Sequence, residues 1–179
     1  MKKEPIDNIK DAFVLTPEKH KDSRGFLCEL YNSNIEYPEF ANQNNRQINF
    51  SKSKKSVLRG IHIAPFSKLV SVLHGSGQDV IIDLRKDSPT YLNTYSMILY
   101  PENMTQLFIP AYCGHGFLSL EDDTVLVYLQ DGNYDPETHK SIRYDDPEID
   151  VKWINKYEII VSQKDYNAPL LKNFEYKIK

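Results

Sequence analysis

The chain has 179 residues, of which 40% are hydrophobic and 26% are charged, and its formal net charge is −3. This length suits one domain with an ordinary core, and the apolar content excludes an intrinsically disordered chain. Nothing in the charge indicates the basic surface of a nucleic-acid-binding protein, and no apolar run approaches the ~20 residues that span a bilayer. We expect a single domain over residues 1–179, located in the cytoplasm, with Cys28 and Cys113 reduced.

Short segments with strand-like alternation recur between turn residues along the chain. In chain order, we predict strands over Gly25–Tyr31, Arg46–Ser51, Ser56–Ile63, Lys68–Leu73, Gln78–Leu84, Thr94–Leu99, Thr105–Ile109, Gly116–Leu120 and Thr124–Gln130. Helix is expected only around Asn34–Phe40 and in the last twenty residues. Many short, evenly spaced strands predict an all-β fold, most simply a jelly roll with short terminal helices.

In two of these strands, Gln78–Leu84 and Thr124–Gln130, side chains alternate between two faces with a period of two. One face of each strand is mainly apolar, and Asp79 and Tyr128 lie on the other face, which mixes polar and apolar residues. Such alternation fits a core face opposite a solvent face. It equally fits a barrel whose lumen is partly polar because it holds a ligand. Periodicity alone leaves both interpretations open.

The segment Val57-Leu58-Arg59-Gly60-Ile61-His62, followed by Lys68, places an arginine, a histidine and a lysine on neighbouring strands. A cluster of this kind suits a diphosphate or a developing enolate. Gly60 permits a β-bulge that brings Arg59 and His62 toward one cavity. The alternative is a histidine that is hydrogen-bonded for structure alone.

His115 lies between Gly114 and Gly116, which let the backbone approach a neighbour closely. A metal-binding cupin needs several histidines and a carboxylate around one ion, and none of the five histidines forms an HxH or HxxxH pair. The chain also lacks GxGxxG, Walker A, GxSxG and CxxC motifs, so we expect neither a metal nor a cofactor. Arg24 fits a surface turn, and Ser162 fits the N-cap of a short helix that contains Asp165.

Eight segments in order, from about Asp22 to Leu171, together resemble the dTDP-4-dehydrorhamnose 3,5-epimerase family. They are DSRGFLCE, QINFSKS, VLRGIH, KLVSVLHG, QDVIIDLR followed by DSPT, IPAYCGHGF, VYLQDGNYDP and SQKDYNAPLL. The resemblance implies a cupin-like jelly-roll β-barrel that forms a homodimer and uses neither cofactor nor metal. It also implies an isomerase that inverts C3, C5 or both of a nucleotide-linked 4-keto-6-deoxy sugar.

By this resemblance, His62 is the base, Asp165 orients it, Tyr128 is the general acid on the opposite face of the sugar, and Lys68 lies near the C4 oxygen. The implied substrate-binding residues are Arg24, Glu29, Gln47, Asn49, Arg59, Asp79, His115 and Tyr134, of which the first two reach a nucleotide across the dimer interface. These residue types fit the chemistry. Imidazole titrates near neutral pH, and an ammonium group stabilises the enolate oxygen.

The chain departs from the family in the segment Ile63-Ala64-Pro65-Phe66-Ser67, which makes the loop before Lys68 short and lacks a glutamine. Ser71 and His74 also replace residues that are often larger or basic. The nucleotide (TDP, GDP or CDP) and the sugar (hexose or heptose) therefore stay open. The alternatives are a nucleotide-sugar 3,4-ketoisomerase on the same barrel and a non-catalytic sugar- or metal-binding cupin. Tyr128 and Asp165 favour the epimerase.

Overall fold

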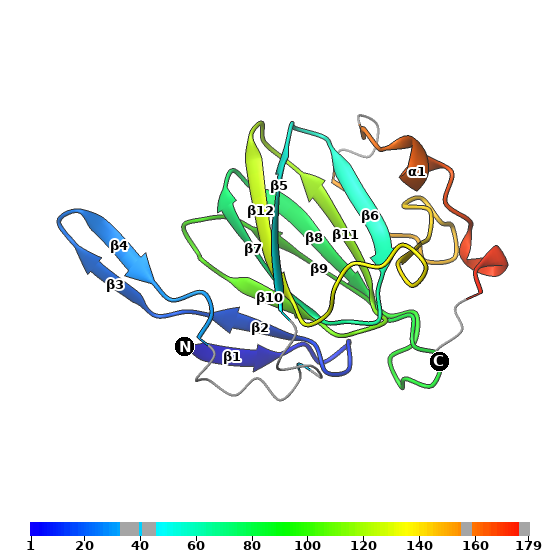
Figure 1. Ribbon diagram of the computed structural model, residues 1–179, viewed down its shortest axis with the longest axis horizontal. Coiled ribbons are helices and arrows are strands. Elements are labelled where there is room, and N and C mark those ends of the chain that lie inside the picture. The colour runs from blue at the N-terminus through cyan, green and yellow to red at the C-terminus, as the bar shows by residue number, and fades with distance from the viewer. Residues whose placement is uncertain (33–39, 41–45, 155–158, 176–179) are drawn as a thin grey trace.

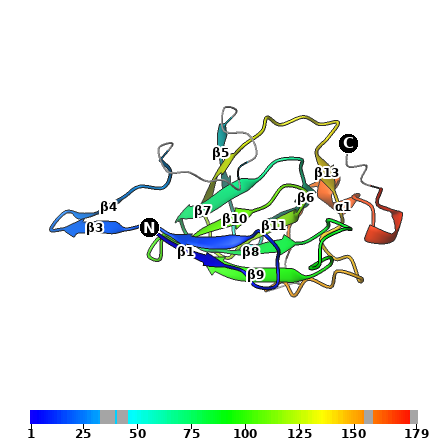
Figure 2. The same ribbon diagram turned by 90° about the horizontal axis from the view of Figure 1, so that it is seen from below.

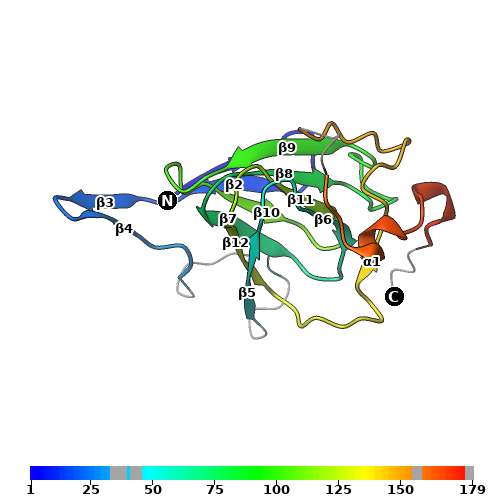
Figure 3. The same ribbon diagram turned by 90° about the horizontal axis from the view of Figure 1, so that it is seen from above.

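The structure is a computed structural model that describes residues 1–32, 40, 46–154 and 159–175. Two antiparallel sheets form its body (Figure 1, Figure 3). The six-stranded sheet runs in the order β1 (Lys2–Pro5), β2 (Phe13–Thr16), β10 (Gln106–Ile109), β7 (Lys68–His74), β12 (Thr124–Gln130) and β5 (Gln47–Ser53). The five-stranded sheet runs in the order β13 (Lys140–Ser141), β6 (Leu58–Ile63), β11 (Gly114–Ser119), β8 (Gly77–Ile82) and β9 (Thr94–Leu99).

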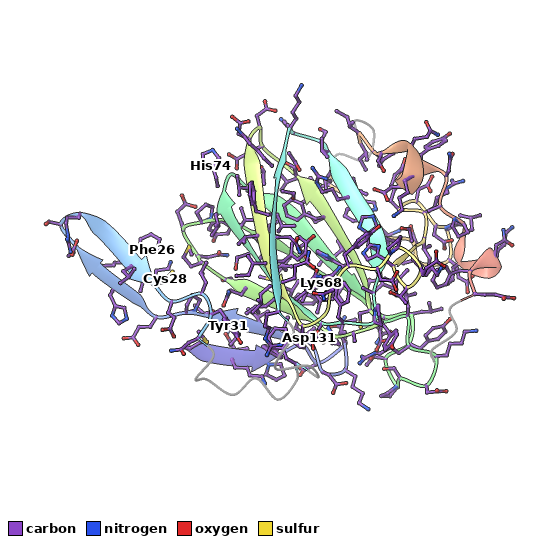
Figure 4. The ribbon with its side chains drawn as sticks, viewed as in Figure 1. Phe26, Cys28, Tyr31, Lys68, His74 and Asp131 are labelled. Carbon is purple, nitrogen blue, oxygen red and sulfur yellow. The ribbon has the colours of Figure 1, made fainter. Side chains whose placement is uncertain are left out.

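Apolar side chains fill part of the space between the two sheets. Val70 and Val72 of β7 pack there against Ile81 of β8 and Phe117 of β11. Burial of this kind contributes roughly 1.5–3 kcal/mol for each large side chain. Polar side chains, among them Gln47, Asn49 and Lys68, line another part of this space, and Figure 4 labels Lys68 near the middle of the molecule.

The outer face of the five-stranded sheet is covered by the C-terminal part of the chain. Val80 and Ile82 of β8 pack there with Ile142 and Trp153. Strand β8 is therefore buried on both faces, so the interpretation with a solvent face is wrong for this strand. The short helices α1 (Gln163–Tyr166) and η1 (Leu171–Asn173) belong to this covering segment, which confirms helix near the C-terminus.

All nine predicted strands are present, with their ends shifted by a few residues, and the all-β prediction is confirmed. Four short strands were not predicted, namely β1, β2, β3 (Lys19–Asp22) and β13. Lys2–Pro5 is exposed along its whole length and Lys19–Asp22 is polar, so neither shows an apolar period. The predicted helix Asn34–Phe40 lies outside the described residues except for Phe40.

Strands β3 and β4 (Gly25–Cys28) form a two-stranded arm that projects away from the body (Figure 1, Figure 2). Phe26 and Leu27 of this arm are 46% and 73% exposed, and Figure 4 shows Phe26 and Cys28 far from the interior. Cys28 and Cys113 are free thiols. No helix in the described part of the chain has the length and apolar character needed to cross a bilayer.

Candidate active site

A cavity of about 770 Å³ lies between the two sheets and is lined by both polar and apolar side chains. Both sheets and the segment that leads into α1 line it. Nine of the twelve predicted site residues lie on its wall, namely His62, Tyr128, Asp165, Lys68, Gln47, Asn49, Arg59, His115 and Tyr134. The fold therefore brings the four predicted catalytic residues together around one cavity.

A bulge in β6 turns both Arg59 and His62 toward this cavity. Residues three positions apart point to opposite faces of a regular strand. Here His62 pairs with His115 and Arg59 pairs with Phe117, so three steps along β6 match two along β11. Gly60 has a φ of +129°, and a Cβ on it would lie 2.6 Å from the carbonyl oxygen of His115. The bulge thus requires glycine, as predicted.

His62 is hydrogen-bonded to Asp165, with 2.8 Å between Nε2 and Oδ1. The carboxylate can only accept, so Nε2 carries the proton and Nδ1 is the basic nitrogen. Burial lowers the pKa of His62, and its neighbours Lys68 and His115 lower it further against the opposing effect of Asp165. His62 is therefore a neutral base at neutral pH.

Asp165 sits in α1, whose first turn is capped by the Ser162 hydroxyl, which accepts from the Asp165 backbone N–H at 3.1 Å. Burial alone would raise the pKa of Asp165, but its bonds with His62 and Ser162 bring that pKa below its usual value. The N-capped helix expected at Ser162 and a carboxylate bonded to His62 therefore occur together in this segment.

Tyr128 projects from β12 in the sheet opposite His62, so the two side chains line different walls. Burial raises the pKa of its hydroxyl, with a smaller opposing effect from Arg59. The phenol is therefore protonated at neutral pH. Tyr128, Leu126 and Gln130 share one face of β12, and all three line the cavity, which confirms a partly polar lumen at this strand.

Lys68 enters the cavity from β7 and is 7% exposed. Its ammonium lies 5.8 Å from the centre of the Phe66 ring and 5.9 Å from that of the Tyr128 ring. Burial lowers the pKa of Lys68 to about 8, although Asp79 opposes the shift. Because the protein shields the Lys68 ammonium from water, its positive charge is suited to stabilise an oxyanion.

Asp79 is completely buried behind His115, and its carboxylate oxygens lie 3.0 and 3.1 Å from His115 Nε2. The expectation that Asp79 itself lines the pocket is therefore wrong. Its side chain orients His115, which does line the pocket. The strand alternation placed Asp79 on the correct face, but it did not reveal that a histidine covers it.

Arg24 and Glu29 lie away from the cavity. Arg24 is exposed in the turn between β3 and β4, where Asp22 holds its guanidinium with hydrogen bonds of 2.6 to 3.3 Å. Glu29 is exposed just beyond β4 and accepts a hydrogen bond from Asn32 at 3.0 Å. Neither residue contributes to the cavity of its own chain.

Four amide groups on β5, β12 and the following loop form a network at one side of the cavity. The Gln47 side chain donates to Asn49 at 2.8 Å, and Gln130 connects to both at 3.3 Å. The backbone N–H of Tyr134 donates to Gln47 at 3.3 Å. This network fixes polar groups that face the cavity.

Sequence reasoning did not single out several residues of the cavity wall. Phe66, Gln130, His139 and Lys164 belong to it. Gln130 follows Tyr128 at the strand period and Lys164 precedes Asp165, so their positions carried a signal. His139 lies in an irregular segment without periodicity. Among residues 1–32, 40, 46–154 and 159–175, no group of three or more metal-ligating side chains is arranged around a common point.

The neutral imidazole of His62 and the protonated phenol of Tyr128 thus lie on opposite walls of the cavity, and the Lys68 ammonium lies beside the space between them. A family model described as dTDP-4-dehydrorhamnose 3,5-epimerase matches residues 7–173. The chain is 37% identical over 175 residues to the dTDP-4-dehydrorhamnose 3,5-epimerase of Methanothermobacter thermautotrophicus, which covers 94% of this chain and 95% of that protein.

Two solved structures share the fold. A Legionella pneumophila dTDP-6-deoxy-D-glucose-3,5-epimerase in complex with dTDP-4-keto-L-rhamnose superimposes with a TM-score of 0.88 at 34% identity, covering 97% of this chain and 94% of that one. A 3'-monoepimerase of Streptomyces bikiniensis, as a His→Asn and Tyr→Phe double mutant with dTDP, gives 0.87 at 30% identity, covering 94% and 87%. This likeness confirms the cupin-like jelly-roll β-barrel, and the chain belongs to the dTDP-4-dehydrorhamnose 3,5-epimerase family.

Proposed function

We propose that this protein inverts C3, C5 or both of a dTDP-linked 4-keto-6-deoxy sugar. The observation that carries the proposal is the arrangement of His62 and Tyr128 on opposite walls of one cavity, with Lys68 beside them. Inversion next to a ketone needs a base on one face of the sugar, an acid on the other face, and a positive group at the oxygen that gains charge.

In the proposed reaction, Nδ1 of His62 takes a proton from the carbon next to the C4 ketone. The electron pair moves to the C4 oxygen, where the Lys68 ammonium stabilises the enolate. Asp165 stabilises the imidazolium that forms, as the orienting carboxylate does in a catalytic triad. The Tyr128 hydroxyl then gives a proton to the opposite face of the same carbon, which inverts its configuration.

The nucleotide is proposed from the two solved structures described above, of which one holds dTDP and the other a dTDP-sugar. The net charge of the chain is −3, so local cations must bind the diphosphate. Arg59, held by Ser53 at 3.1 Å, lines the cavity together with Lys164. Tyr134, which is 52% exposed, marks the mouth of the cavity.

We also propose a homodimer in which the β3–β4 arm of one subunit covers β5 of its partner. Strand β5 ends the six-stranded sheet, and its outward Ile48 and Phe50 are 70% and 75% exposed. Phe26 and Leu27 of the arm are apolar and exposed as well. Covering a sheet edge with such a segment removes an aggregation site, and the same contact would bring Arg24 and Glu29 to the partner's cavity.

The remaining expectations are proposed on the same basis. The whole chain would act as one epimerase domain, and its free cysteines suit the reducing cytoplasm. No step of the proposed reaction uses a metal or a redox cofactor, since the protons are moved by side chains.

The test is incubation of the protein with dTDP-4-keto-6-deoxyglucose in deuterated water, followed by NMR of the sugar. We expect deuterium at C3, C5 or both, together with inverted configuration at the labelled carbon. Movement of the carbonyl to C3 would identify a ketoisomerase, and no exchange would contradict catalysis. An EDTA-treated sample should react at the same rate, whereas activity restored by one divalent ion would favour a metal-dependent cupin. Parallel GDP- and CDP-linked sugars test the choice of nucleotide.

A further inference from the structure

Three aromatic rings follow one another along one wall of the cavity. The ring of His139 lies 5.1 Å from that of Tyr134 at the mouth and 5.2 Å from that of His62, measured between centroids. The backbone fixes this position, because the N–H of His139 donates to the Asp135 carbonyl at 2.9 Å. Strand β13 then begins at the next residue, and its Ser141 pairs with His62. His139 thus has a defined place between the proposed base and the entrance.

The two nitrogens of His139 differ in their surroundings. Nδ1 is enclosed by protein and has no hydrogen-bond partner. Nε2 is not enclosed, and no group in the described part of the chain bonds to it. A buried N–H without an acceptor is rarer in proteins than an unpaired acceptor. The proton of neutral His139 therefore belongs on Nε2, which makes that nitrogen a donor. His139 lines both the cavity that holds His62 and a second pocket next to Pro169 and Phe174, and its ring stands between those of His62 and Tyr134 on the side of the first.

The His139 ring is also kept uncharged. Burial lowers the pKa of His139 to about 3, and its neighbours Lys68, His62 and Lys164 lower it further against the opposing effect of Asp165. A second cation at this distance from His62 would repel the imidazolium that forms when His62 takes a proton. A neutral donor avoids that repulsion and still offers a hydrogen bond to the ligand.

We propose that His139 is a further substrate-binding residue, whose Nε2–H donates to an oxygen of the nucleotide sugar between the base and the mouth of the cavity. The acceptor is either a hydroxyl group of the sugar or an oxygen of the diphosphate. This inference rests on the proposed function, because it takes a nucleotide sugar as the occupant of the cavity. It adds a contact that the mechanism itself does not require.

The direct test is long-range ¹H–¹⁵N NMR of the protein labelled with ¹⁵N-histidine, with the His139 signals assigned by their loss in His139→Phe. We expect the Nε2–H tautomer between pH 6 and 8, and a changed Nε2 resonance on addition of dTDP-D-xylose, which has no ketone and cannot react. Addition of dTDP alone separates the two acceptors, because a phosphate contact responds to it and a sugar contact does not. A proton on Nδ1, or no response to either ligand, overturns the inference.

Kinetics provide a second test. His139→Phe keeps a ring but removes the donor, and we expect KM to rise about tenfold with kcat nearly unchanged, the value of one hydrogen bond. His139→Gln keeps a donor and should recover most of that loss. The matched control is His74→Phe, because His74 lies exposed at the end of β7 and outside the cavity (Figure 4). Equal KM values for wild type and His139→Phe would overturn the inference. If the wild type shows no exchange while His139 responds to dTDP-D-xylose, the proposed function fails and the binding role stands.

Discussion

Nε2 of His62 lies 2.8 Å from Oδ1 of Asp165, although 103 positions separate the two residues in the chain. Backbone hydrogen bonds hold their segments together. The N–H of Leu58 donates to the Ile160 carbonyl at 2.8 Å, and the N–H of Ile160 donates to the Ser56 carbonyl at 2.8 Å. The start of β6 and the approach to α1 are thus fixed to each other, so the pair does not depend on a mobile side chain.

The first prediction concerns this pair. His62→Asn should lower turnover by roughly 10²–10⁴, because it removes the group that we propose takes the proton. Asp165→Asn should also lower turnover, since an amide does not stabilise the imidazolium. The two substitutions act on one unit, so the double variant should be little worse than His62→Asn. Rates of deuterium exchange from solvent into the sugar measure all three.

Thermal unfolding supplies the control for these variants. The melting temperature of His62→Asn should stay near that of the wild type, which would separate loss of chemistry from loss of fold. Near-normal exchange in His62→Asn would remove His62 from the role of base. Losses that simply add in the double variant would show that Asp165 acts independently of His62.

The second prediction concerns pH. The proposed active forms are neutral His62 and charged Lys68. The pKa of His62 is lowered, so activity should persist below pH 6.5 as the pH falls. The pKa of Lys68 is about 8, so kcat/KM should fall as the pH rises through about 8 and the ammonium loses its charge. A pH profile of kcat/KM measures both limbs.

Substitutions of Phe66 test whether the expected fall of kcat/KM at high pH is due to Lys68. The Phe66 ring lies over the Lys68 ammonium, and Phe66→Gln would replace an apolar neighbour with a polar one. Burial then lowers the pKa of Lys68 less, so the alkaline limb should move to higher pH. Phe66→Leu keeps the apolar contact and should leave the limb near its original position. An unchanged limb in Phe66→Gln would assign it to another group.

The amino-acid sequence predicted most of the strands that have an apolar period and the motif around His62, but it missed the short apolar strand Phe13–Thr16. The period of two also placed Tyr128 and Gln130 on the cavity face, because side-chain direction in a strand is a local property. It missed Lys2–Pro5 and Lys19–Asp22, since edge and arm strands that bury little surface need no apolar pattern. These strands are defined by their pairing partners, which a local pattern does not contain.

The candidate site also contains some features that a local sequence pattern reveals and others that depend on contacts between distant segments. The Gly60 bulge was predictable, because a glycine between two basic residues is a local signal. The screening of Asp79 by His115 was not, because it depends on the packing of β8 against β11. His139 was missed for a related reason. Only the pairing of β13 with β6 brings an irregular segment beside His62.

The third prediction concerns the bulge. Gly60→Ala would place a Cβ 2.6 Å from the His115 carbonyl oxygen at a φ of +129°, and we expect a loss of about 3 kcal/mol in unfolding free energy. Gly25→Ala is the matched control, since Gly25 has a φ of +132° but no atom within 4 Å of the added Cβ. It should cost about 1 kcal/mol. Equal losses in denaturant unfolding would show that backbone conformation, and not the close approach to β11, requires glycine at Gly60.

The fourth prediction tests the proposed dimer. Arg24→Ala and His62→Asn should each impair the homodimer. A mixed dimer contains one site with His62 and a partner's Arg24, so mixing the two variants should restore up to about half of the wild-type activity per mixed dimer. Differently tagged subunits allow the mixed dimer to be purified before the assay. A mixed dimer that stays as impaired as its parents would show that Arg24 does not serve the partner's site.

The last prediction separates removal of the proton from inversion. Tyr128→Phe keeps the ring and nearly the same volume, so packing should change little. His62 would still form the enolate and Lys68 would still stabilise it, because neither step uses the phenol. The sugar should therefore take up deuterium at C3 or C5 while mostly keeping its configuration, and NMR of the same sample reports both. His62→Asn should show neither exchange nor inversion. Slow inversion through a water molecule fits the proposal as long as exchange is faster. Inversion at the wild-type rate would mean that another group is the acid, and Tyr134, which also lines the cavity, would be the first to replace.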